Sequence, residues 1–282
     1  MPKKLNENEE DLWKVHITYN VKEHKRITHP ILLEKPNILY YIHHHGGNED
    51  VNLISKEENL RLIRKKLPEC QIIETMVNYV DYYDVIGNLA KIISKEKKHA
   101  KELNKISRIT INAGTGSKMV AIANIDAHRL WDVNIIYPYS LNYDPNASST
   151  HSGAMVAAEP PKLEFRKPSI ELIQAMQILY WLKQHDPYGR KREFVQQKDW
   201  QDAIYEIFKI DHVTKNSDPK KYDSSQKMRI KEKYVKRLDK YWHFLYRTKQ
   251  GRSYKVYFTE EGLKMAKVFM NYDYGVNFDS EK

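Results

Sequence analysis

The first half of the chain alternates short apolar segments with longer amphipathic ones. Strands are predicted where Val, Ile, Thr and Tyr are dense, over 13–20, 38–44, 71–79, 107–113 and 133–139. Helical periodicity lies between most of them, over 57–67, 83–104 and 118–130, with a further short helix expected over 26–34. This alternation predicts an α/β domain whose mainly parallel sheet carries helices on both faces.

The pattern changes after residue 141. Residues 142–162 are rich in Asn, Pro, Ser, Gly and Ala without a strand or helix period, so we expect a long surface connection and then a last strand over 163–167. A helix is expected from Ser169, which is placed to act as the N-cap. The remaining predictions are helices over 192–208 and 227–242, a polar connection over 211–225, strands over 243–248 and 252–258 around a turn at 249–251, and a final helix to residue 270.

Three helices, a β-hairpin and a closing helix make an α+β arrangement. This order, with Thr259-Glu260-Glu261-Gly262 after the hairpin, is similar to the winged helix-turn-helix of many microbial regulators. By that resemblance the helix over 227–242 enters the major groove of DNA, and the hairpin contacts phosphates or the minor groove.

Length and composition fit two domains. The chain has 282 residues, 41% of them apolar, and we place the domains at 1–168 and 169–282. No stretch of 18 apolar residues and no charged-then-apolar leader occurs, so we expect no membrane partner and no secretion. The single cysteine, Cys70, excludes a disulfide framework and a cysteine-based zinc site, which fits a reducing cytoplasm.

The net charge of +10 is concentrated in the second half. Residues 1–150 carry 21 Lys and Arg against 19 Asp and Glu, a difference of +2, whereas residues 151–282 carry 26 against 18, a difference of +8. A high density of basic residues on the predicted helix and hairpin favours binding to the phosphates of duplex DNA. The alternative is a basic face that is only solvated. The residues predicted to bind DNA are Lys227, Arg229, Lys233, Lys236, Arg237, Lys240, Arg247, Lys249 and Arg252.

A glycine-containing loop follows the strand over 107–113. It runs from Ala113 to Lys118 with glycines at 114 and 116, and it opens the next helix. Glycine lets backbone amides approach a ligand, a helix N-terminus favours anions, and Lys118 adds a cation. The loop matches neither the Walker A pattern nor GxGxxG. It is predicted to bind a phosphate or another anion, the alternative being a tight turn capped by Ser117.

The segment from Asn112 to Met119 resembles the N-x-[ST]-[GST]-G-[ST]-K signature of CARF domains, the CRISPR-associated Rossmann fold. The chain as a whole is similar to archaeal CARF-like regulators that carry a C-terminal winged helix. This resemblance implies a Rossmann-like homodimer in which two such loops form a cleft for a cyclic oligoadenylate, an effector rather than a cofactor. Ala113 and Gly114 depart from the residues of many members, which leaves the identity of the ligand open. The ligand-binding residues that the resemblance implies are Asn20, Asn112, Gly114, Thr115, Gly116, Ser117 and Lys118.

The histidines of the first half are predicted to form neither a metal site nor a catalytic base. His43, His44 and His45 are adjacent near the end of a strand, where neighbouring side chains alternate faces, so the three cannot converge on one metal ion. No metal site is expected there. His16 lies inside a strand, and we expect a packed core residue rather than a catalytic base.

The sequence therefore predicts a ligand-responsive, DNA-binding transcriptional regulator, with no catalytic residue assigned. Two alternatives stay open. The first is a ring nuclease that slowly cleaves the cyclic oligoadenylate, with Thr115, Ser117 and Lys118 positioning it and stabilising charge. The second is a nucleotide-regulated protein-binding module whose basic surface meets an acidic partner.

Overall fold

The computed structural model describes residues 11–44, 49–143, 151–159, 166–185, 192–208 and 224–278. The chain divides into two compact units, Met1–Phe165 and Arg166–Lys282, with the border three residues before the expected one. Within the described residues, no helix combines the length and the apolar character needed to cross a membrane.

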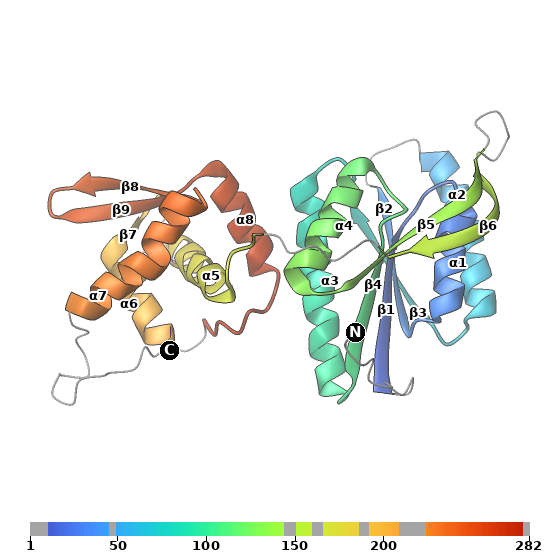
Figure 1. Ribbon diagram of the computed structural model, residues 1–282, viewed down its shortest axis with the longest axis horizontal. Helices are drawn as coiled ribbons and strands as arrows, with labels where there is room; N and C mark the ends of the chain where they lie inside the picture. Colours follow the sequence, from blue (N-terminus) through green and yellow to red (C-terminus); the bar gives the residue numbers. More distant parts are fainter. Residues whose placement is uncertain are drawn as a thin grey trace. The chain divides into compact units, whose positions relative to one another are not determined.

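Unit 1 is built around one six-stranded sheet. Its strands are β1 (Leu12–Tyr19), β2 (Ile38–His44), β3 (Gln71–Val77), β4 (Ile106–Asn112), β5 (Asn134–Tyr143) and β6 (His151–Ala158), in the order β3-β2-β1-β4-β5-β6. The first five pair in parallel, and β6 pairs antiparallel with β5. Helices α1 (His24–Glu34) and α2 (Glu49–Lys66) cover one face, and α3 (Tyr82–Glu102) and α4 (Lys118–Trp131) cover the other (Figure 1). The expected mainly parallel sheet with helices on both faces is confirmed.

The two faces of the central strands differ in polarity. The face towards α3 and α4 carries buried apolar side chains, namely Val15, Ile17, Tyr19, Ile109 and Ile111. The opposite face, under α1, carries a line of polar side chains that we call the polar column: Lys14, His16 and Thr18 of β1 with Arg108, Thr110 and Asn112 of β4. Strands of parallel sheets covered on both faces are normally apolar throughout. The polar column is therefore a departure from what burial alone would select.

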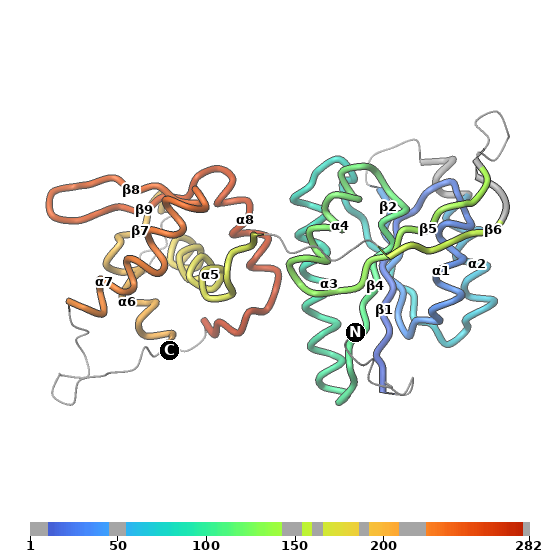
Figure 2. Tube along the Cα trace, in the orientation of Figure 1, coloured from blue at the N-terminus to red at the C-terminus, as the bar shows by residue number. Residues whose placement is uncertain are grey.

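The edge of the sheet corrects one expectation. Residues 142–162 were expected to form an irregular connection, but β5 continues to Tyr143 and residues 151–158 form β6 beside it (Figure 2). An edge strand needs only one hydrogen-bonding neighbour, so β5 alone suffices to order this small-residue segment. The last strand expected over 163–167 is not seen in its described part, since Arg166 and Lys167 lie outside any strand, and residues 163–165 fall outside the described residues.

Unit 2 combines helices with a three-stranded antiparallel sheet of order β7-β9-β8. In chain order its elements are α5 (Ile170–Gln184), β7 (Val195–Gln196), α6 (Gln197–Phe208), α7 (Ser224–Ile230), the π-helical turns η2 (Lys231–Val235) and η3 (Arg237–Tyr241), β8 (Leu245–Gln250), β9 (Ser253–Phe258) and α8 (Glu260–Met270). The core joins all of them, with Trp200 fully buried and its indole N–H donating to the Ala175 carbonyl over 2.9 Å. The predicted caps are confirmed, because Ser169 accepts from the Leu172 amide and Thr259 from the Gly262 amide.

Several elements of unit 2 differ from expectation in their bounds or type. Helix α6 begins at Gln197 rather than 192, because the backbone of Val195 is committed to pairing with Val256 of β9. The expected single helix over 227–242 starts as α7 and widens into η2 and η3. Strand β8 begins at Leu245 rather than 243, because His243 adopts a left-handed φ of 52° that interrupts an extended chain. The connection expected over 211–225 lies, up to residue 223, outside the described residues.

Candidate functional site

The glycine loop lies at the switch point of the sheet of unit 1. Strand β1 leads through α1 to β2 on one side, whereas its neighbour β4 leads through α4 to β5 on the other side. Open α/β sheets bind ligands at such a point, beside the carboxyl ends of the strands. Here those ends are Asn20, after β1, and Asn112 with the 113–117 loop, after β4.

Asn112 and Thr115 hold the loop from beneath. The side chain of Asn112 is fully buried, donates to the Arg26 carbonyl over 2.8 Å and accepts from the Gly114 amide over 3.0 Å. The Thr115 hydroxyl, in a residue 2% exposed, donates to the Asn112 carbonyl and accepts from the Tyr19 amide, both over 3.2 Å. These two predicted site residues therefore position the loop and the end of β1, and they do not face solvent.

The two glycines are required by close approaches. Gly116 has a φ of +88°, and a Cβ there would lie 2.8 Å from Cγ1 of Val120. A Cβ on Gly114 would lie 2.7 Å from Cδ of Pro138 in β5. The loop is thus pressed between α4 and β5, and only glycine fits at either position.

Ser117 and Lys118 form the N-terminus of α4. The Ser117 hydroxyl accepts from the Val120 amide over 3.2 Å, as an N-cap, and donates to the Tyr79 carbonyl over 2.5 Å. Lys118 is exposed in the first helical turn. The first amides of a helix have no acceptor within it, and the helix dipole adds positive potential there. An anion above this turn would therefore meet amide donors and the Lys118 ammonium together.

Asn20 belongs to a buried hydrogen-bonded chain rather than to the loop itself. Its side-chain oxygen accepts from the Tyr41 hydroxyl over 2.7 Å, and that hydroxyl accepts from the Asn59 amide over 3.1 Å. Asn59 in turn bonds His24 over 2.9 Å. Burial raises the pKa of Tyr41, so its hydroxyl stays neutral and serves as a fixed donor. The chain of contacts fixes the end of β1 against α1 and α2.

Sequence reasoning missed three partners of the loop. Tyr79, after β3, supplies the carbonyl that fixes Ser117. Pro138 packs against Gly114, and its carbonyl accepts from the Arg26 guanidinium over 3.2 Å. Arg26 also bonds Glu23 over 2.7 Å, so its charge is already paired. Their distances from the loop in sequence, 38 residues for Tyr79 and 86 for Arg26 to Asn112, left no local signal by which to find them.

In unit 2 the predicted DNA-binding residues occupy the helix of α7, η2 and η3 and the β8–β9 hairpin. Eight are exposed: Lys227, Arg229, Lys233, Lys236, Arg237, Lys240, Lys249 and Arg252. Arg247 is the exception, because it pairs with Asp239 over 2.9 Å and donates to Gln197 over 3.2 Å, with 15% of its side chain exposed. Arg247 thus ties the hairpin to η3 and to α6.

Some of the exposed cations are paired within the protein and others are not. Lys233 pairs with Glu171 over 2.8 Å and Lys236 with Glu232 over 2.7 Å. The hydrogen bond to Glu171 raises the pKa of Lys233. Among the described residues, no ion pair or hydrogen bond engages the side chains of Arg229, Arg237, Lys249 or Arg252.

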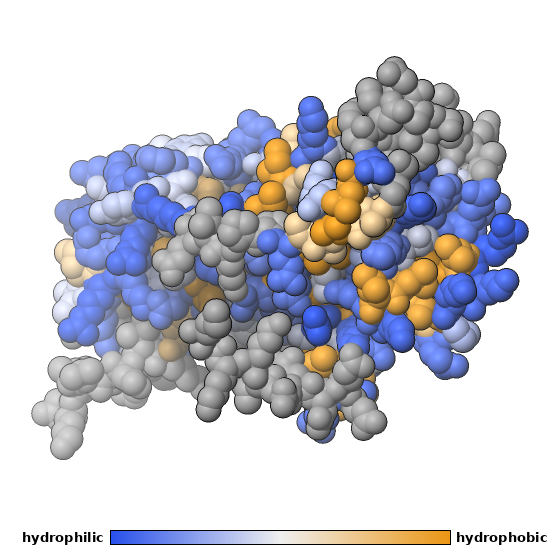
Figure 3. All heavy atoms as spheres, turned by 45° about the vertical axis from the view of Figure 1, so that its right-hand side comes forward, coloured by the Kyte–Doolittle hydropathy of each residue, from blue (hydrophilic) through white to orange (hydrophobic). Residues whose placement is uncertain are grey.

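On the face shown in Figure 3, hydrophilic residues dominate unit 2, whereas apolar residues gather over unit 1.

Two of the three adjacent histidines, His43 and His44, lie within the described residues. His44 Nδ1 accepts from the Tyr79 amide over 3.1 Å, and burial lowers the pKa of His43. Across the described residues no group of three or more His, Cys, Asp or Glu side chains is arranged to hold a metal ion. His45 falls outside the described residues.

One family model matches part of unit 1. A family model described as "HFX_2341_N:-like, N-terminal" matches residues 14–143, less than half of the chain. No curated protein matches the chain at a significant level.

Three solved structures are similar at low identity. Can2 from Sulfobacillus thermosulfidooxidans, in complex with cyclic tetra-adenylate, is 17% identical over 43% of this chain and 31% of its own, with a TM-score of 0.33. Csm6 from Enterococcus italicus, bound to cyclic hexa-2'-fluoro-hexa-dAMP, is 11% identical over 44% of this chain and 32% of its own, with a TM-score of 0.37. Protein VC1899 from Vibrio cholerae is 9% identical over 91% of this chain and 65% of its own, with a TM-score of 0.32.

The chain spans less than two thirds of the length of each of these proteins. Such low TM-scores assign neither ligand nor activity to this chain. The family model, by contrast, is matched over residues 14–143, which include β1 to β5 of the Rossmann-like sheet in unit 1.

Proposed function

We propose that the chain is a ligand-responsive, DNA-binding regulator. Unit 1 binds a cyclic oligoadenylate or a similar nucleotide in the manner of a CARF domain, and unit 2 binds duplex DNA as a winged helix-turn-helix. The observation that carries the proposal is the position of the glycine loop, at the switch point of the sheet and at the N-terminus of α4.

The loop is suited to an anionic ligand because its polar side chains already have hydrogen-bond partners within the protein. Asn112, Thr115 and Ser117 bond the protein and keep Gly114, Gly116 and Lys118 in place. A ligand phosphate then meets a preformed set of donors, which reduces the ordering that binding requires. The choice of a cyclic oligoadenylate rests on the resemblance of the sequence Asn112–Met119 to the CARF signature.

A homodimer is part of this proposal. Met119 and Ile122 follow the loop on α4 and are 36% and 51% exposed, although both are apolar. A second copy packed on this helix in two-fold symmetry would cover them and bring two loops together. Light scattering should then give twice the 33.5 kDa of one chain at micromolar concentration, whereas a monomer would contradict the dimer.

The DNA-binding role rests on the order of elements in unit 2 and on its exposed cations. Helices α5 and α6, the helix formed by α7, η2 and η3, and the β8–β9 hairpin follow the order of a winged helix. Arg229 and Arg237 lie on that third helix, and Lys249 and Arg252 lie at the tip of the hairpin. π-helical turns often occur at functional sites, which agrees with a role for η2 and η3 in presenting side chains to the groove.

Binding is favoured over cleavage by the state of the two hydroxyl groups. The cleavage alternative needs the hydroxyls of Thr115 and Ser117 to position the nucleotide, but both hydroxyls are engaged in bonds within the protein. Incubating the protein with cyclic tetra-adenylate and analysing the nucleotide by mass spectrometry should return the intact ring. A linear product formed at a rate that depends on the protein would instead support the ring nuclease.

The ligand site is tested by titration calorimetry with cyclic tetra-adenylate. Lys118→Ala should weaken binding roughly tenfold to hundredfold, because it removes a charge-assisted phosphate contact. The matched control is Lys91→Ala, an exposed lysine on α3, which should bind like the parent. Equal affinity of the parent and Lys118→Ala would contradict the site.

The DNA interface is tested by measuring affinity for duplex DNA across a salt series. The double substitution Lys236→Ala with Arg237→Ala should flatten the slope of log affinity against log salt by about 0.9 for each phosphate contact removed. The control is Lys267→Ala on α8, which should leave the slope unchanged. A slope that is the same in all three proteins would show that the basic helix faces away from DNA.

A further inference from the structure

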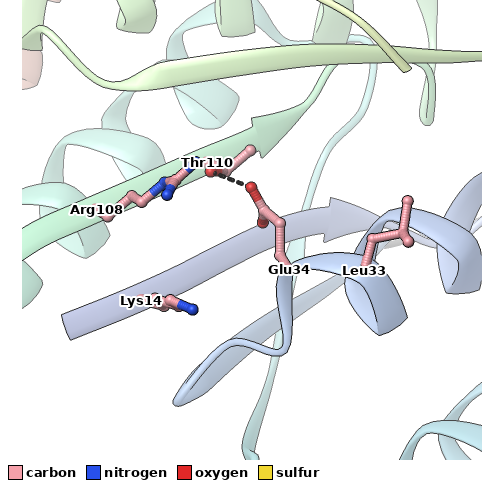
Figure 4. A pocket seen from close by; sticks show the side chains of 5 residues that line it. All are labelled: Lys14, Leu33, Glu34, Arg108 and Thr110. Atoms are coloured by element: carbon pink, nitrogen blue, oxygen red, sulfur yellow. Dashed lines mark hydrogen bonds between the residues drawn. The ribbon is translucent and has the colours of Figure 1, made fainter. Parts of the chain in front are cut away.

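A hollow of about 210 Å³ lies at the other end of the polar column from the glycine loop. It is lined by Lys14 of β1, Arg108 and Thr110 of β4, and Leu33 and Glu34 at the end of α1. Figure 4 shows the Glu34 carboxylate near the middle, with Lys14 and Arg108 on one side and Leu33 on the other. The volume of the hollow is below the roughly 300 Å³ at which ordinary ligand pockets begin, so its ligand is small.

Glu34 is fixed in the floor of this hollow. His16 Nδ1 lies 2.6 Å from one carboxylate oxygen, and the Thr110 hydroxyl donates to the other over 2.7 Å. Burial raises the pKa of Glu34, but bonding and charge from His16, the Thr110 bond and the nearby Arg108 outweigh it and lower the pKa. The carboxylate is therefore charged at neutral pH, and both of its oxygens are engaged.

The lining residues offer a ligand one cationic donor group and an apolar wall. Arg108 is exposed and forms no hydrogen bond or ion pair with any described residue. Lys14, also in the lining, is half-buried and adds positive charge to this end of the polar column. The guanidinium group presents paired N–H donors that match a carboxylate or a phosphate. Leu33 supplies the apolar side.

Packing alone does not account for this arrangement. His16 is fully buried in the polar column, and its Nε2 has no hydrogen-bond partner among the described residues. Buried polar groups without partners reduce stability, and proteins retain such departures mainly at functional sites. The part-buried pair of His16 and Glu34 also makes no contact with the glycine loop, whose contacts involve other residues.

We propose that the hollow between β1, β4 and the end of α1 is a second binding site, for a small organic anion. The Arg108 guanidinium binds the carboxylate or phosphate of that ligand in a paired fashion, and Lys14 adds charge. Glu34 bonds His16 and Thr110 at the base of the hollow, and its negative charge repels anions too large to keep away from it. Leu33 contacts the apolar part of the ligand. This site is separate from the nucleotide site and does not depend on it.

The test is titration calorimetry of the full chain with succinate and with glycerol 3-phosphate, at constant ionic strength. One of the two probes should bind saturably with one site per chain, and binding should be roughly tenfold to hundredfold weaker in Arg108→Gln. The matched control is Arg61→Gln, an exposed arginine on α2, which should bind like the parent. Saturable binding of succinate alone identifies a carboxylate ligand, and binding of glycerol 3-phosphate alone identifies a phosphate ligand.

Two results would overturn the proposal. One is that neither probe binds saturably, or that Arg108→Gln binds as the parent does. The other is that Lys118→Ala removes the binding while Arg108→Gln keeps it, because the anion would then occupy the glycine loop. Circular dichroism of Arg108→Gln should match the parent, since the exposed side chain has no partner among the described residues.

Discussion

The glycine loop of unit 1 and the basic surface of unit 2 are both proposed binding sites, yet they are built in opposite ways. In the loop, Asn112 and Thr115 are buried and bonded to the protein, and Lys118 alone of the predicted side chains is fully exposed. On the basic surface eight of nine predicted side chains are exposed, and only Arg247 is held inside by Asp239 and Gln197.

This difference has consequences for mutation. A residue that positions a loop contributes to stability and to binding at once, so its loss should lower both. An exposed cation contributes to binding through charge and adds little to folding, because surface ion pairs are worth about 0–1 kcal/mol. Substitutions in the loop should therefore lower the free energy of unfolding without any ligand present, whereas substitutions of the exposed cations should leave it nearly unchanged.

The largest effect is expected from Asn112→Ala. The substitution removes the bonds to the Gly114 amide and the Arg26 carbonyl in a fully buried position. We expect the free energy of unfolding to fall by roughly 2–4 kcal/mol, measured by urea denaturation. Lys118→Ala serves as the control and should unfold like the parent. A loss below about 0.5 kcal/mol for Asn112→Ala would contradict its positioning role.

Two glycines with a positive φ, one in each unit, give a matched pair for substitution. Gly116 has a φ of +88° and a Cβ there would clash with Val120, whereas Gly251 has a φ of +59° with nothing within 4 Å. Gly116→Ala should therefore cost about 2–3 kcal/mol of unfolding free energy, and Gly251→Ala only about 1 kcal/mol for the backbone conformation. Thermal unfolding of the two variants measures the difference. Equal losses would show that the loop is not packed as described.

Within unit 2, Arg247 and Lys249 should behave differently although they lie two residues apart. Arg247→Ala leaves Asp239 without its 2.9 Å partner and should destabilise the protein by roughly 1–2 kcal/mol. Lys249→Ala should change stability by less than about 0.5 kcal/mol and instead flatten the salt slope of DNA binding by about 0.9. The reverse pattern, in denaturation and in a salt series, would mean that Arg247 is the DNA contact.

The smallest effect is expected in the pH dependence of stability. The pKa of Glu34 is lowered in the folded state, so its contribution is present above the ordinary value of 4.5 and is lost as the pH falls through the folded value. Glu34→Gln should therefore make stability fall less steeply below about pH 4.5 than in the parent. Glu260 also has a lowered pKa through Lys264, but it is fully exposed, and Glu260→Gln should leave the acid limb nearly unchanged. Urea denaturation at pH 3 to 6 compares the three proteins.

Much of the architecture could be predicted because its signals are local. The run 38–44 begins with five apolar or aromatic residues and forms β2 with those bounds, and Ser169 and Thr259 cap the helices that follow them. Segment 151–158 could not be predicted as a strand, because its small and polar residues have no strand period and its order comes from pairing with β5.

The position of the glycine loop in the fold could be predicted from the sequence, but the contacts of its residues could not. The loop position follows from the glycines and the helix start, which are local features. The inward direction of Asn112 and Thr115 depends on the Arg26 carbonyl and the Tyr19 amide, which are remote in sequence. The hollow at Arg108 could not be predicted from the sequence for the same reason. Its lining comes from β1, β4 and the end of α1, which are remote from one another in sequence.

Regulation requires that nucleotide binding in unit 1 and DNA binding in unit 2 are coupled, and calorimetry of cyclic tetra-adenylate with and without saturating duplex DNA measures this coupling. We expect DNA to change the affinity for the nucleotide by roughly 5-fold to 150-fold, corresponding to about 1–3 kcal/mol, and the nucleotide to change DNA affinity by the same factor. Lys118→Ala should lose the effect of the nucleotide on DNA while retaining its own DNA affinity. Equal nucleotide affinity with and without DNA would contradict the claim that ligand binding in unit 1 regulates unit 2.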